Sequence, residues 1–176
     1  MMNQEMPQIL PRWTELPSIE LYSDQVVTLI TQVLEPVLGS HPESGRKRDT
    51  GILTGAMLNN YVKMKIIPAP VKKQYTRTQV ATLMVLCILK QVYSIQDISA
   101  LIDIALDNTK LSTAYNSFCK LFEAVLYCIK EKKDFQDITA ENDRVYLLKS
   151  VLISCCTKFY VRNTLHALPK AVNTKS

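Results

Sequence analysis

Apolar residues recur in steps of three and four along most of this 176-residue chain, and this period predicts a fold of packed helices. The last third contains the two longest runs: Tyr115, Phe118, Phe122, Val125 and Ile129, and then Val145, Leu148, Leu152, Cys155 and Phe159. They predict two long helices, the second from about residue 141 to 167, and the polar segment between them predicts an antiparallel helical hairpin. Apolar residues outside these runs indicate further neighbours, either within the monomer or across a dimer interface.

Capping residues predict where three shorter helices begin. Ser or Thr precedes an apolar run at each of these places, twice with a capping Gln or Asp three residues later, so we expect helices at about 23–38, 76–91 and 94–106. Before them, a proline-containing tail through Pro17 is expected to be extended, with Trp13 as an apolar anchor. A polar loop at 39–49 follows the first of these helices.

A helix at 54–64 is predicted to have two different faces. At about 100° per residue, Leu58 and Tyr61 lie on an apolar side, whereas Asn59, Asn60 and Lys63 lie on the opposite side. One side would pack against the protein, and the other would offer amides and a positive charge.

Two closely spaced prolines interrupt the helical pattern after this helix. Pro68 and Pro70 exclude a helix at 66–75, and Val71–Tyr75 is predicted to be the return strand of a small hairpin. The predicted elements therefore follow the order of a winged helix-turn-helix: helix, connector, polar-faced helix, basic hairpin and helix.

Positive charge is concentrated in the same part of the chain. The formal net charge is +5. Residues 1–45 contain one basic and six acidic residues, residues 46–90 contain nine basic and one acidic residue, and residues 91–176 contain eleven basic and nine acidic residues. A local excess of this kind is typical of a surface that binds a polyanion, although a solvated helix face gives the same count. Arg46, Lys47 and Arg48 in the polar loop are candidates for an auxiliary basic arm.

We therefore expect a DNA-binding surface. A short helix in the major groove can use Asn to bind an adenine edge and Lys to bind guanine or phosphate, and the hairpin can contact the backbone. The candidate DNA-binding residues are Asn59, Asn60, Lys63, Lys72, Lys73, Tyr75 and Arg77. Packing is the favoured role for the two tyrosines, Tyr61 and Tyr75.

The sequence gives little support to other classes of function. The five cysteines have no C-x-x-C spacing and lie in apolar runs, so we expect reduced, packed thiols. No catalytic triad motif, zinc-binding H-E-x-x-H or glycine-rich phosphate loop occurs, so we expect no enzyme, no metal and no cofactor. The longest apolar stretch is too short to span a bilayer and the N-terminus has no signal-peptide pattern, so we expect a cytoplasmic protein without membrane association.

Three stretches carry a resemblance to a known family: 53–63 (LTGAMLNNYVK), 67–77 (IPAPVKKQYTR) and 89–98 (LKQVYSIQDI). Over about residues 13–105 the chain resembles a bacterial family of unknown function with a MerR-like helix-turn-helix. The resemblance implies DNA binding and a dimer that forms through the C-terminal helices. Three features depart from MerR-type regulators: Asn59 replaces the usual arginine, Lys65 replaces a glycine after the helix, and the 39–49 segment replaces a tight turn.

The sequence thus predicts a mainly α protein: a tail at 1–17, a MerR-like winged helix-turn-helix with a small β-hairpin wing at 18–106, and a long antiparallel helical hairpin at 107–176. The expected function is sequence-specific binding of double-stranded DNA in transcriptional regulation, as a homodimer, with the effector left open. The alternative is a helical protein-interaction module that keeps the motif's shape without binding DNA.

Overall fold

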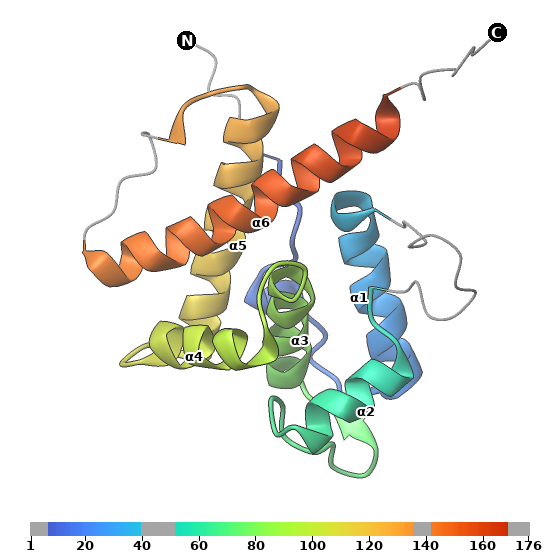
Figure 1. Ribbon diagram of the computed structural model, residues 1–176. Coiled ribbons are helices and arrows are strands. Elements are labelled where there is room, and N and C mark those ends of the chain that lie inside the picture. The colour runs from blue at the N-terminus through green and yellow to red at the C-terminus, as the bar shows by residue number, and fades with distance from the viewer. Residues whose placement is uncertain (1–6, 40–51, 136–141, 169–176) are drawn as a thin grey trace, which may run out of the picture.

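The computed structural model describes residues 7–39, 52–135 and 142–168, and these ranges are mainly helical (Figure 1). Six α-helices are present there: α1 (Ser23–Leu38), α2 (Gly55–Lys63), α3 (Arg77–Leu89), α4 (Ile95–Leu106), α5 (Leu111–Lys130) and α6 (Asp143–Ala167). A 3-10 turn, η1 (Trp13–Glu15), and two short strands, β1 (Leu21–Tyr22) and β2 (Gln74–Tyr75), complete the fold. The helices predicted from periodicity and capping are therefore confirmed to within a few residues. The predicted loop at 39–49 lies, apart from Gly39, outside the described residues.

Helix α3 occupies the centre of the molecule, with α1, α5 and α6 packed around it (Figure 1). Its buried residues fall on all sides of the helix, because each side meets a different neighbour. A single cluster of buried side chains extends from Leu10 to Phe159. The core therefore continues across residue 106, where the sequence suggested a boundary between two units.

The two strands form a small antiparallel sheet at one end of α1. Leu21 lies opposite Tyr75, and Tyr22 lies opposite Gln74. This pairing attaches the segment after α2 to the start of α1, so α2, the strands and the start of α1 lie together at the lower end of the molecule in Figure 1.

The N-terminal tail is held against α5 by a buried carboxylate. Glu123 is 4% exposed and accepts hydrogen bonds from the backbone N–H groups of Ile9 (2.8 Å) and Leu10 (3.0 Å). The same carboxylate forms an ion pair with Arg12 at 2.5 Å. Trp13 packs edge-on against Tyr115 with ring centroids 6.4 Å apart, so the predicted aromatic anchor is confirmed.

Helices α5 and α6 do not form the predicted antiparallel hairpin. Helix α6 begins near the end of α4, crosses α5 obliquely and also contacts α3 (Figure 1). The apolar residues of α6 cover more of its circumference than one seam can bury. The oblique crossing lets α6 pack against α3, α4 and α5, and Arg162 and Asn163 donate hydrogen bonds to carbonyls at the end of α1. Val151, outside the predicted seam, is 5% exposed as a result.

The five cysteines are free and buried, as predicted. Burial raises the pKa of Cys87 and of Cys119 to about 11, so both thiols stay protonated at neutral pH. Within the described ranges, no helix combines the length and the apolar character needed to cross a membrane.

Candidate nucleic-acid interface

Helix α2 has the two faces that its sequence predicts. Leu58 and Tyr61 are 0% and 5% exposed and pack into the core. Asn59, Asn60 and Lys63 are exposed on the other side. Their amide and ammonium groups are therefore available to an external partner.

Helix α2 ends in a turn that places a lysine in left-handed backbone geometry. The N–H of Ile66 donates to the carbonyl of Tyr61, and the N–H of Lys65 donates to the carbonyl of Val62, both at 3.0 Å. These two bonds define a Schellman motif, in which the residue at the Lys65 position is usually glycine. Lys65 has φ 58° and is exposed. The sequence comparison noted this lysine only as a departure from the MerR pattern, and its positive φ makes it a further candidate site residue.

Two more lysines form the tip of a tight hairpin. The N–H groups of Val71 and Gln74 each donate to the other residue's carbonyl, at 3.2 Å and 2.9 Å. Between them, Lys72 has φ 49° and Lys73 has φ 66°, and both side chains are exposed. Two-residue turns with positive φ at both positions strongly prefer Asn-Gly or Asp-Gly, because an L-side chain is strained there.

The hairpin is shorter than the sequence predicts. Val71–Tyr75 is not a single return strand, because the turn at Lys72 and Lys73 lies inside it. Before the turn, only Val71 pairs with β2, through Gln74, and the other partner of β2 is β1. Pro68 and Pro70 explain the difference, since a proline has no N–H to donate to a strand ladder.

Two of the predicted DNA-contact residues make their contacts within the protein itself. Tyr75 is 2% exposed and its burial raises its pKa, so it is a core residue and not a DNA ligand. The Nε of Arg77 donates to the carbonyl of Pro17 at 3.3 Å, and its guanidinium lies 5.8 Å from the ring centroid of Trp13. Arg77 therefore holds the N-terminal tail and is only half-exposed.

A second basic residue of the positively charged segment is also engaged inside the protein. The Nζ of Lys90 donates to the carbonyl of Ile52 at 2.8 Å and lies 5.9 Å from the ring centroid of Tyr61. Burial lowers the pKa of Lys90. The suggested basic arm at 46–48 lies outside the described residues.

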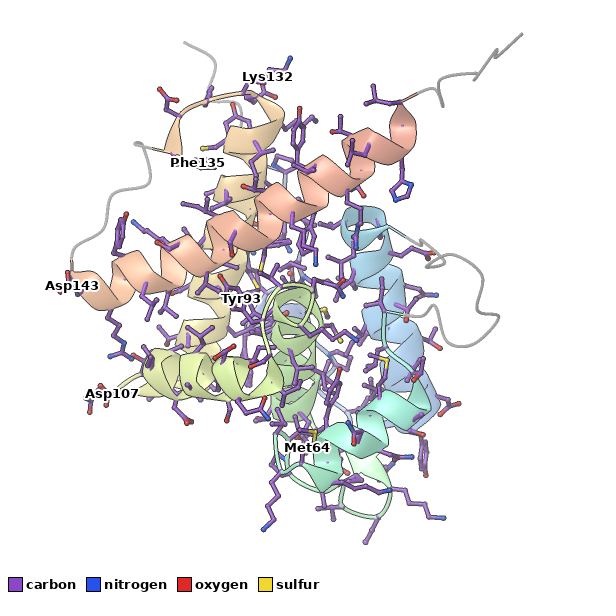
Figure 2. The ribbon with its side chains drawn as sticks, viewed as in Figure 1. Met64, Tyr93, Asp107, Lys132, Phe135 and Asp143 are labelled. Carbon is purple, nitrogen blue, oxygen red and sulfur yellow. The ribbon has the colours of Figure 1, made fainter. Side chains whose placement is uncertain are left out.

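The remaining exposed groups define what we call the basic face: Asn59, Asn60, Lys63, Lys65, Lys72 and Lys73. Helix α2 and the strand that follows the hairpin lie at the same end of the molecule, far from the C-terminal end of α6 (Figure 1). Met64, next to two of these lysines in the chain, lies at that end, whereas Lys132 lies at the opposite end (Figure 2). The chain has no Asp or Glu from residue 50 to residue 96, so no acidic residue of this segment opposes the four lysines.

This arrangement suits a polyanionic partner. The lysines can bind phosphate oxygens, and the two asparagine amides can each donate and accept hydrogen bonds at a base edge.

Comparisons with known proteins identify a family but not an activity. No curated protein and no solved structure matches the chain. A family model described as a domain of unknown function (DUF1836) matches residues 11–118, from the tail through α4 into α5. The match includes the whole basic face and more than half of the chain, which therefore belongs to the DUF1836 family of unknown function.

Proposed function

We propose that this protein binds double-stranded DNA through the basic face, as a MerR-like winged helix-turn-helix protein that acts in transcriptional regulation. In this proposal Asn59 and Lys63 on α2 read base edges in the major groove. Asn60 supports these contacts, and Lys65, Lys72 and Lys73 bind phosphates and set the register of the protein on the duplex.

One observation carries the proposal: the backbone conformation of three lysines. Lys65, Lys72 and Lys73 all have positive φ, at positions where glycine or asparagine would be less strained. An L-residue in this conformation is destabilised by roughly 1–2 kcal/mol, so the three together cost about 3–6 kcal/mol. Three such lysines on one exposed face support a role for their charge there, whereas Lys132, which has the same conformation, lies at the opposite end of the molecule and serves as a control.

The order of elements supports the same function. The chain runs from β1 through α1 and α2 to the Lys72–Lys73 turn, β2 and α3. A winged helix-turn-helix likewise places a polar-faced second helix before a basic hairpin, and that helix enters the major groove.

We also propose that the protein acts as a homodimer through the C-terminal part of α6. Val161, Leu165 and Leu168 follow one another in steps of four and three, and they are 47%, 63% and 57% exposed. Val161 and Leu165 lie on one side of α6, Leu168 directly follows the helix, and the three side chains can pack against the same residues of a second copy. A twofold dimer would bind two half-sites related by inverted symmetry.

Salt-dependent DNA binding tests the proposed function. The logarithm of the affinity for duplex DNA should fall steeply with the logarithm of salt concentration, by about 0.9 for each neutralised phosphate. The double variant Lys72→Ala, Lys73→Ala should reduce this slope by about 1.8. The matched control is Lys132→Ala, Lys133→Ala, which removes an adjacent exposed pair at the opposite end of the molecule and should leave the slope unchanged.

Two results would refute the proposal. The first is a failure of the wild-type protein to bind duplex DNA at low salt, and the second is an equal loss of slope in both double variants. The first result would favour the second candidate function, a helical protein-interaction module. The observation behind that alternative is the exposed apolar stripe on α6.

A further inference from the structure

A cavity of about 380 Å³ lies between α3, α4, α5 and α6. Most of its lining is apolar and comes from all four helices, for example Val85, Leu101, Phe118 and Leu148. Small-molecule sites in proteins have volumes of about 300–1,000 Å³ and similar apolar walls. The cavity is therefore large enough for a small hydrophobic molecule.

Polar groups at one edge of the cavity can orient such a molecule. Thr109 belongs to the turn between α4 and α5, and Asn142 and Arg144 belong to the start of α6. Asp107 and Asp143, which neighbour these residues in the chain, lie on one side of the molecule (Figure 2). Asn142 already caps α6, because its Oδ1 accepts a hydrogen bond from the N–H of Val145 at 3.0 Å. Arg144 is the one charged residue among the described residues that line the cavity.

The guanidinium of Arg144 is held by a partner that a ligand can replace. It pairs with the Asp107 carboxylate at 3.3 Å and donates to the Asp107 carbonyl at 2.8 Å. The two side chains are 34% and 66% exposed, and ion pairs in such contact with water are weak. A carboxylate that arrives with an apolar group would bind the same guanidinium and gain the burial of that group in addition.

We propose that this cavity binds a small hydrophobic carboxylic acid, with its apolar chain between the four helices and its carboxylate at Arg144. The walls select an apolar body, and the single guanidinium selects an acidic end over a neutral one.

The position of the cavity connects it to the basic face. Val85 and Leu89 of α3 line the cavity, and α3 begins directly after β2 and the hairpin. A bound acid would therefore contact the helix that supports Lys72 and Lys73. This connection rests on the proposed DNA binding, whereas the binding of the acid does not.

Titration calorimetry of the full chain with decanoate and with decan-1-ol tests the site. We expect one decanoate per chain, bound at least about tenfold more tightly than the alcohol, because a charge-assisted hydrogen bond contributes about ten- to a hundredfold in affinity. Arg144→Gln should remove this preference and leave the affinity for the alcohol unchanged. Lys149→Gln removes a cation of α6 that does not line the cavity, so it should change neither affinity.

A second variant tests the location. Ala105 lines the cavity, and Ala105→Phe should fill it and abolish binding of both probes while circular dichroism shows an unchanged helix content. Saturable binding of neither probe by the wild type, equal affinity for both probes, or unchanged decanoate binding by folded Ala105→Phe would each overturn the proposal. If Ala105→Phe does not fold, Arg144→Gln still decides, because it changes a partly exposed side chain. All these measurements use free protein, so a failure of DNA binding would not affect their outcome.

Discussion

Two lysines offer a matched test of the reasoning about strain and charge. Lys65 ends α2 with φ 58°, and Lys132 follows α5 with φ 54°. Lys132 has the same Schellman bonds: its N–H donates to the carbonyl of Ile129 at 3.2 Å, and the N–H of Lys133 donates to the carbonyl of Cys128 at 2.8 Å. Lys65→Gly and Lys132→Gly therefore remove the same charge and the same strain from opposite ends of the molecule (Figure 2).

Both substitutions should stabilise the protein by a similar amount. Relief of the left-handed conformation returns roughly 1–2 kcal/mol, and the greater freedom of glycine in the unfolded chain removes about 0.5–1 kcal/mol of that gain. We expect a net increase of about 0.5–1 kcal/mol in the free energy of unfolding. For a chain of this length, that increase corresponds to a Tm higher by about 1–4 °C.

Their effects on DNA binding should differ. Lys65→Gly removes one proposed phosphate contact, so the salt slope should fall by about 0.9, whereas Lys132→Gly should not change it. Thermal unfolding and fluorescence anisotropy with a labelled duplex measure the two quantities on the same samples. The reasoning about strain is refuted if neither variant is more stable, and the placement of the basic face is refuted if the two variants lose equal DNA affinity.

Four further predictions concern the rest of the fold. Glu123→Ala should lower the free energy of unfolding by about 3 kcal/mol, because it leaves a half-buried arginine and two backbone N–H groups without their acceptor, and Glu123→Gln should cost less. Denaturant unfolding measures both, and an unchanged stability of Glu123→Ala would show that the tail contributes nothing. The five thiols should resist a thiol-specific reagent at pH 8 until urea unfolds the protein. Stability should also fall between about pH 9 and 11, because the thiols of the unfolded chain ionise first while Cys87 and Cys119 in the folded protein keep a pKa of about 11. The loss is about 1–2 kcal/mol per thiol at pH 10, and a flat profile of stability against pH would contradict the burial. Leu165→Glu should convert the proposed dimer to monomers in sedimentation experiments, because Leu165 is exposed on the proposed interface, whereas Thr164→Glu at the neighbouring position should not. A monomeric wild-type protein would rule out the proposed α6 interface.

The polar face of α2 shows what was predictable from the sequence. The alternation of Leu58 and Tyr61 with Asn59, Asn60 and Lys63 follows from the helical period alone, and the structure buries and exposes these residues as expected. Hydrogen bonds between residues four positions apart set the helical period, so the neighbouring residues are sufficient to predict this pattern.

Arg77 and Lys90 show what was not predictable. Both count toward the positive charge of the central segment, yet Arg77 is bound to the carbonyl of Pro17 and Lys90 to the carbonyl of Ile52. These partners lie 60 and 38 positions away in the chain. No local pattern contains that information, and Tyr75 likewise became a core residue because β2 pairs with a strand that precedes α1.

By itself, the sequence determined the helices, their caps, the position of the hairpin and the concentration of positive charge, because each depends on interactions between residues close together in the chain. The tertiary structure decided which cations remain in solvent, how α6 crosses α5 and where a cavity remains between four helices. Those outcomes depend on how side chains from distant segments fill a common core, and the free energy of such packing is a property of the whole assembly of helices and not of any one segment.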